Sequence, residues 1–227
     1  AAPFSTPRQG GPAAPGTAVT VSPAGLAGPS TEITGGFDAL DSNDNLFETW
    51  PPDPQLAAGP DHIVEMVNNI GAIFEKDGSL VDSFALKDLF DTPNDWFDFD
   101  PKVIYDDDSG RLFATYVAYL DESFGTDPAQ LLTAVSTTSD PTDPWDVYVI
   151  DFNNVFPDYP GIGVTDDKVT VSVNLFDIDG PPGSIAPGCN SYGFCGVQTI
   201  IMEKSQMVAG DPSISIFVTG ADLDRFT

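Results

Sequence analysis

Three aspartates stand at the start of three similar segments of the chain. The segments begin at Asp53, Asp100 and Asp158, and in each a proline follows within two residues. A short apolar strand, an acidic turn and a longer apolar strand come next. Carboxylates that meet in space must be neutralised by a hard cation such as Ca²⁺, by protonation or by backbone N–H donors. The three aspartates are therefore candidate metal ligands, while the simpler interpretation is that each one caps the turn into its strand.

Shorter acidic runs offer further oxygen ligands. Asp106 and Asp108 belong to a run of three aspartates, and another run covers residues 41–44. Asp177 and Asp179 alternate with apolar or small residues, as side chains do at the start of a calcium loop. No run has the glutamate that completes the twelve-residue EF-hand pattern. The sequence thus predicts a bound Ca²⁺ without indicating which loop holds it.

The charge of the chain is strongly negative. There are 35 acidic residues and 8 basic ones among 227, a formal charge of −27. Such a field repels phosphate backbones, so nucleic acids and anionic membranes are poor partners and cations are good ones. Calcium binding, a saline habitat that screens self-repulsion and a need for solubility all remain explanations of this charge.

The two cysteines are close in sequence. Five residues, including Gly193, separate Cys189 from Cys195. This loop is short enough to be closed by a disulfide, which predicts an oxidising, extracellular compartment. Two separate buried thiols are the alternative. A zinc site is not expected, because the only histidine, His62, is remote from both cysteines and no second cysteine pair exists.

Glycoside hydrolysis is the catalytic alternative, because it needs two carboxyl groups in different protonation states. Asp53, Asp100 and Asp158 supply carboxylates, and Glu122 is the best available general acid in a chain with few glutamates. A serine hydrolase is not expected, since His62 has no Gly-x-Ser-x-Gly partner.

Each of the three tryptophans lies near proline and aspartate. Trp50, Trp96 and Trp145 have a sequence environment typical of side chains that stack on a sugar ring or a partner residue. Packing between sheets explains them equally well.

The elements that would position these residues are short strands. Residues 1–36 are rich in proline, glycine, alanine, serine and threonine and are predicted to be a flexible leader. Residues 37–227 are predicted to form one all-β domain, with at most a short helix within residues 84–90. The sequence contains no apolar run of about 18 residues, so no membrane span is predicted. Strands are predicted at residues 63–68, 72–75, 103–105, 112–119, 131–136, 147–152, 169–175, 199–204 and 214–219.

The spacing of the three aspartate-led segments predicts a β-propeller. The segments start 47 residues (53 to 100) and 58 residues (100 to 158) apart. The first spacing fits one blade of four strands, and the second fits a blade with an inserted loop near residues 121–128. About four blades are expected, either as a small propeller or as part of a larger ring. A sandwich or barrel is the alternative architecture.

The segments at residues 51–64, 100–106 and 158–164 resemble those of a poorly characterised family of secreted bacterial proteins with propeller repeats. The resemblance covers about residues 45–205 and implies repeat architecture and an extracellular location. The aspartates at the starts of the segments show a weaker resemblance to five-bladed furanosidase-type glycosidases. That resemblance implies base and modulator roles for Asp53, Asp100 and Asp158.

Together these observations predict a secreted, acidic, calcium-binding module that acts without catalysis. Its expected partner is an extracellular protein or a glycan, and assembly with further blades or subunits is expected as well. A glycoside hydrolase is the alternative function.

Overall fold

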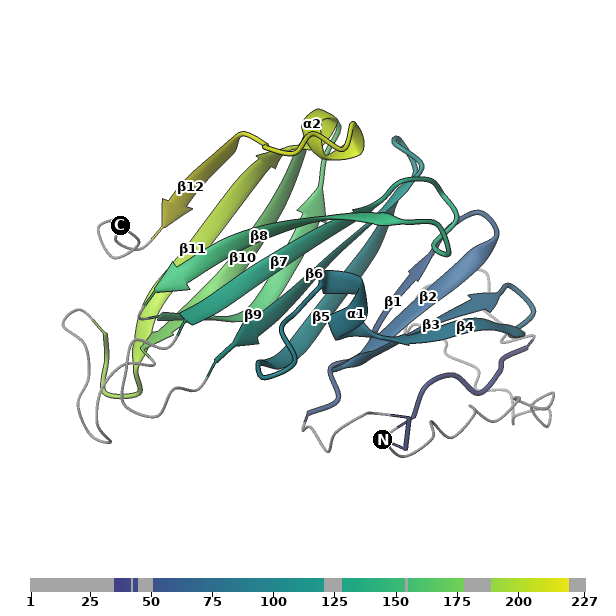
Figure 1. Ribbon diagram of the computed structural model, residues 1–227, viewed down its shortest axis with the longest axis horizontal. Helices are drawn as coiled ribbons and strands as arrows, with labels where there is room; N and C mark the ends of the chain where they lie inside the picture. Colours follow the sequence, from purple (N-terminus) through teal and green to yellow (C-terminus); the bar gives the residue numbers. More distant parts are fainter. Residues whose placement is uncertain are drawn as a thin grey trace, which may run out of the picture.

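The fold is all-β and consists of three four-stranded antiparallel sheets. The sheets follow one another in chain order and pack through their faces, with β4 at one end of the molecule and β12 at the other (Figure 1). In each sheet every strand pairs with the next strand in the chain, so each sheet is a simple meander. The computed structural model describes residues 35–41, 43–44, 51–120, 128–153, 155–177 and 189–220.

The first sheet contains four short strands connected by tight turns. These are β1 (Gln55–Ala58), β2 (His62–Val67), β3 (Ile70–Glu75) and β4 (Leu80–Ala85), followed by the short helix α1 (Leu86–Phe90). The turn between β3 and β4 depends on Gly78, which has a φ of +90°. A Cβ at this glycine would lie 2.4 Å from the ring of Phe37, so the glycine also lets the preceding segment approach the sheet.

Apart from β12, the strands of the second and third sheets are longer. The second contains β5 (Phe97–Asp106), β6 (Arg111–Tyr119), β7 (Pro128–Ser136) and β8 (Trp145–Asn153). The third contains β9 (Val155–Val164), β10 (Lys168–Asp177) and β11 (Phe194–Glu203), then the short helix α2 (Lys204–Val208) and β12 (Ile216–Gly220).

The second sheet is the middle layer of the stack and is buried on both faces. Strand β6 shows this most clearly, since its residues from Leu112 to Ala118 are all buried. One face of the second sheet packs on the first sheet through a cluster that includes Met66 and Tyr116. The opposite face packs on the third sheet through a cluster that includes Phe113 and Val171. A strand covered on both sides reads as a continuous apolar run, as β6 does.

The third sheet has one covered face and one open face. In β10 the buried residues alternate with partly exposed ones, and Val169, Val171 and Val173 point towards the second sheet. Thr170 and Ser172 lie on the other face. Such alternation is expected of a strand with one face in the core.

The chain before the first sheet lies against that sheet. Phe37 packs on Phe74 of β3 with ring centroids 5.2 Å apart, and the backbone N–H of Leu40 donates to the Glu65 carboxylate at 2.8 Å. Residues 1–34, most of the predicted leader, lie outside the described part of the chain.

The expected class is confirmed, but the number of sheets and one helix differ from expectation. The described residues form three four-stranded sheets rather than about four sheets, because seven of the eight strands in the second and third sheets are nine or ten residues long and use more of the chain. The short helix predicted within residues 84–90 is present as α1, whereas α2 was not predicted. Among the described residues no helix is long and apolar enough to cross a membrane.

Candidate acidic site at the start of the three sheets

The first strand of each sheet is entered or interrupted by a residue with left-handed backbone conformation before a proline. The residues are Asp53 (φ 44°), Asp100 (φ 56°) and Tyr159 (φ 48°). A positive φ is uncommon outside glycine, and a residue before proline usually has extended conformation. The positive φ before a proline recurs in three sheets, which indicates that the surrounding structure imposes this conformation and that it is not a local irregularity.

The left-handed residues of the second and third sheets belong to β-bulges. In the pairing of β5 with β6, Phe99 lies opposite Val117 and Lys102 opposite Thr115, so two residues of β5 face one residue of β6. The corresponding shift between β9 and β10 leaves Tyr159 and its proline opposite one residue of β10. A bulge bends its strand and redirects the neighbouring side chains.

The third segment differs from the other two by one residue. In the first two segments one aspartate provides both the left-handed backbone and the carboxylate. In the third, Tyr159 provides the backbone conformation and Asp158 the carboxylate. The extra residue seen before the proline in the sequence therefore separates two functions that Asp53 and Asp100 combine.

The structure brings the three carboxylates within electrostatic reach of one another. Burial raises the pKa of Asp100 to about 6, and repulsion from Asp53 and Asp158 adds to this effect. Asp100 is only 7% exposed. A hydrogen bond from the backbone N–H of Tyr159 at 3.2 Å and the nearby Lys102 ammonium act in the opposite direction. These two interactions offset only part of the cost of a buried, crowded carboxylate.

Asp158 lies in a similar but milder environment. Burial raises its pKa, an interaction with the Asn174 side chain lowers it, and repulsion from Asp53 raises it again. Asn174 lies directly opposite Asp158 in the pairing of β9 with β10. The acidic site, meaning Asp53, Asp100 and Asp158, thus has two carboxyl groups that hold protons more strongly than free aspartate.

Lys102 places a positive charge beside the acidic site and packs over the Tyr159 ring. The Lys102 ammonium lies 3.9 Å from the centroid of the Tyr159 ring, and Lys102 is 8% exposed. This cation–π contact connects the second sheet to the third and holds a positive charge near Asp100. The sequence pattern did not single out Lys102, although its position two residues after Asp100 placed it on the same strand.

A buried aspartate and tyrosine lie close to the acidic site. Burial raises the pKa of Asp98, while the Tyr116 hydroxyl and the Lys87 ammonium lower it. Tyr116 is fully buried and stacks on Phe90 of α1 with ring centroids 5.1 Å apart. The sequence analysis missed both residues. The alternation of Asp98 with Asp100 in one strand was the only available signal.

A lysine pairs with two aspartates of the turn between β5 and β6. The Lys204 ammonium lies 2.7 Å from an Asp106 carboxylate oxygen and 3.3 Å from one of Asp108. Against the effect of burial, hydrogen bonds from Lys204 and Ser109 lower the pKa of Asp106. Lys204 also donates to the Thr165 carbonyl at 3.0 Å, so it joins the second and third sheets. The positive charge beside these two predicted calcium ligands is therefore an ammonium group of the chain itself.

The remaining predicted ligands and acids are not gathered at the acidic site. The backbone N–H of Asp177 donates to the Gly193 carbonyl at 2.9 Å, in the hairpin between β10 and β11. Asp179 and Glu122 lie outside the described residues. Within the described part of the chain, no group of three or more histidine, cysteine, aspartate or glutamate side chains is arranged to hold a metal ion. A calcium ion at the acidic site would thus need backbone carbonyls and water to complete its coordination.

The predicted disulfide between Cys189 and Cys195 is confirmed. It closes a short loop that leads into β11.

His62 and the tryptophans have separate surroundings. His62 lies 3.8 Å from carboxylate oxygens of both Glu75 and Asp140, which is an ion pair only when the imidazole is protonated. Trp145 lines a groove between the first and second sheets. Trp96 packs against the core between the same two sheets, and Trp50 lies outside the described residues.

Comparison of the chain with protein-family models and with curated proteins gives no match.

Proposed function

We propose that the three sheets are consecutive blades of an acidic, extracellular β-propeller that acts as a binding or scaffold module without catalysis. The observation that carries this proposal is the arrangement of the first strands. Strand β1 contacts β5, and β5 contacts β9. The same left-handed residue before a proline precedes β1 and lies within β5 and β9. Sheets whose first strands line a common axis are typical of propellers.

The stacking of the sheets favours a propeller over a two-layer sandwich. The second sheet packs on the first with one face and on the third with the other. A sandwich has only two layers and leaves one face of each sheet to solvent. Three meanders stacked in chain order are expected when each sheet is one blade.

Further blades or subunits are proposed to cover the open face of the third sheet. On the edge strand β12, Phe217 lies opposite Ile201 on this open face and is 65% exposed. The corresponding face of the second sheet is buried by its neighbour, which supports a continuation of the same stacking.

The acidic site is proposed to bind Ca²⁺ and so stabilise the meeting point of the blades. Support comes from the mutual repulsion of Asp53, Asp100 and Asp158, which a divalent cation would relieve. An oxidising location, indicated by the disulfide, is where millimolar Ca²⁺ is available to weak extracellular sites.

The experiment compares thermal unfolding in EDTA, in 1 mM CaCl₂, in 1 mM MgCl₂ and in 1 M NaCl. Stabilisation by calcium at low concentration, with little effect of magnesium, is the expected result. Stabilisation by molar salt alone would attribute the effect to screening of the net charge and would contradict a specific site.

Glycoside hydrolysis is the second candidate, because a carboxyl group with a pKa of about 6 beside two other carboxylates suits acid–base catalysis. The test is hydrolysis of a panel of chromogenic aryl furanosides by the wild-type chain and the Asp100→Asn variant. Turnover that the variant loses would favour the enzyme, and the absence of turnover with calcium-dependent stability would favour the binding module.

A further inference from the structure

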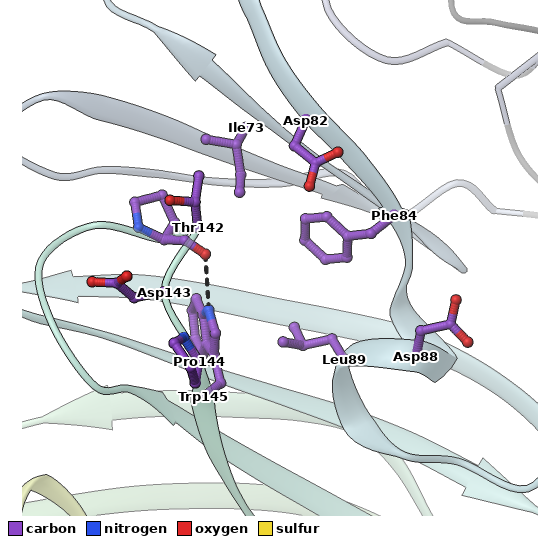
Figure 2. Close-up of a pocket in the computed structure, with 10 residues that line it drawn as sticks. Ile73, Asp82, Phe84, Asp88, Leu89, Thr142, Asp143, Pro144 and Trp145 are labelled. Carbon is purple, nitrogen blue, oxygen red and sulfur yellow. Dashed lines mark hydrogen bonds between the residues drawn. The ribbon is translucent and has the colours of Figure 1, made fainter.

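A groove lies between the first and second sheets, away from the strands that carry the acidic site. Its volume is about 460 Å³. Residues of β4 and α1 form one wall, and the turn before β8 forms the other (Figure 2). A groove of this size suits one large side chain with its flanking backbone or a small organic ligand.

The walls of the groove are apolar and held in place. Figure 2 shows Phe84 and Leu89 on one side and Pro144 and Trp145 on the other. The Trp145 indole N–H donates to the Pro141 carbonyl at 3.1 Å, which fixes the ring in the wall.

The opposite wall is fixed by a glycine. The Phe84 ring lies against Gly71 of the neighbouring strand, where a Cβ would lie 2.6 Å from the ring. Phe84 therefore occupies space that only a residue without a side chain leaves open, and the groove is shaped before a ligand arrives.

Three aspartates border the groove. Asp82 and Asp88 come from the first-sheet side, and Asp143 comes from the turn opposite. In Figure 2 the Asp82 carboxylate points towards the Phe84 ring, whereas those of Asp88 and Asp143 point away from the groove. The Thr138 hydroxyl donates to Asp143 at 2.6 Å and so positions it, while Asp82 and Asp88 are exposed. The lining residues include no lysine, arginine or histidine. Among the lining residues the carboxylates thus carry the only formal charges, and Asp82 is the one that faces the apolar walls.

This combination matches the chemistry of a basic side chain. Lysine and arginine have an apolar stem that packs on aliphatic and aromatic walls and a charged end that pairs with carboxylates. Arginine also stacks on tryptophan and phenylalanine rings. The formal charge of −27 would draw such a partner towards the surface.

We propose that this groove binds an arginine or lysine side chain presented by an extended segment of a partner protein. The proposal names a class of partner for the binding module described above and rests on that function. It does not depend on calcium at the acidic site. The two can therefore fail separately.

The test is a titration of the ¹⁵N-labelled protein with short acetylated and amidated Gly-Ser peptides that contain one central arginine, lysine or citrulline. The readout is the indole N–H signal of Trp145 in NMR spectra, assigned through the Trp145→Phe variant. A saturable shift with arginine or lysine and a much smaller one with citrulline is the expected result, since citrulline has the shape of arginine without its charge.

Matched variants separate the groove from the general negative charge. Asp82→Asn combined with Asp88→Asn is expected to weaken binding of the basic peptides about tenfold. Asp151→Asn combined with Asp166→Asn removes two exposed carboxylates elsewhere and is expected to weaken it less than about twofold. Both carry the same charge change, and dispersed spectra with unchanged signals elsewhere establish that each variant is folded.

Four results would overturn the proposal. Equal shifts with citrulline would exclude charge recognition, and equal weakening in both double variants would reduce the interaction to nonspecific attraction. A saturable shift with neutral monosaccharides and none with the peptides would make the groove a glycan site. If the wild-type protein bound none of the peptides but still melted in a calcium-dependent way, the groove proposal would be refuted and the proposed calcium-binding function would not.

Discussion

Replacing Asp100 with asparagine tests the reasoning about the acidic site most directly. The carboxylate is buried on β5 and repelled by Asp53 and Asp158, so the folded chain holds its proton more strongly than the unfolded chain. Asparagine has nearly the same shape and keeps an oxygen that can accept the hydrogen bond from the Tyr159 N–H. Asp100→Asn therefore removes the charge with little change in packing.

The size of the effect follows from the pKa of Asp100. A rise from 3.8 to about 6 corresponds to about 3 kcal/mol, at about 1.4 kcal/mol for each pH unit. Because the folded pKa is the higher one, the wild-type protein carries no penalty below about pH 4. The penalty grows between pH 4 and 6 and is complete above pH 6. Asp100→Asn should thus increase the free energy of unfolding by about 2 to 3 kcal/mol at pH 7.5 and change it little at pH 4.

Urea unfolding in EDTA, followed by tryptophan fluorescence at several values between pH 4 and 8, measures this difference. The matched control is Asp166→Asn, an exposed carboxylate in the turn between β9 and β10, which should change the free energy of unfolding by less than about 0.5 kcal/mol. A gain from Asp100→Asn that is the same at every pH, or a loss at pH 7.5, would refute the account. In saturating Ca²⁺ the order should reverse if the ion binds Asp100, because the variant then lacks a ligand.

Three further perturbations test contacts elsewhere in the fold. Lys204→Met leaves Asp106 partly buried without its counterion and should lower the free energy of unfolding in urea by about 2 kcal/mol. Lys168→Met, which removes an exposed pair, should lower it clearly less, and equal losses would contradict this distinction. Gly71→Ala should displace Phe84 and cost about 1 to 3 kcal/mol by calorimetry, so an unchanged melting temperature would show that the ring moves freely. Reduction of the Cys189–Cys195 disulfide, which closes a small loop, should destabilise the chain by about 2 kcal/mol in paired melts with and without a phosphine reductant, and no shift would mean that the loop is already ordered without it.

The sequence predicted the parts of the structure that depend on local pattern. Alternating residues in β10 and the continuous apolar run in β6 indicated strands. The spacing of two cysteines was enough to predict the disulfide. The repeated aspartate and proline fall just before or within the first strand of each sheet, and the same backbone conformation recurs there.

Contacts between distant segments could not be predicted in this way. The pairing of Lys204 with Asp106 joins residues 98 positions apart, and nothing near either residue indicates it. The cation–π contact of Lys102 with Tyr159 depends on the one-residue shift in the third segment. The groove is formed by two sheets together, so Trp145 could be recognised as a candidate for stacking while its neighbours could not.

The stacking of meander sheets in chain order has a consequence for how the protein folds. Within each sheet, every strand pairs with the strand next to it in the sequence. In the described part of the chain, the extensive contacts between sheets join sheets that are consecutive in the sequence. Closing such short loops loses little chain entropy, so each sheet can form soon after its own segment leaves the ribosome and then serve as a template for the next. Because each sheet depends mainly on its immediate neighbours, the third one, with its open face, is expected to exchange its amide hydrogens before the buried middle sheet does.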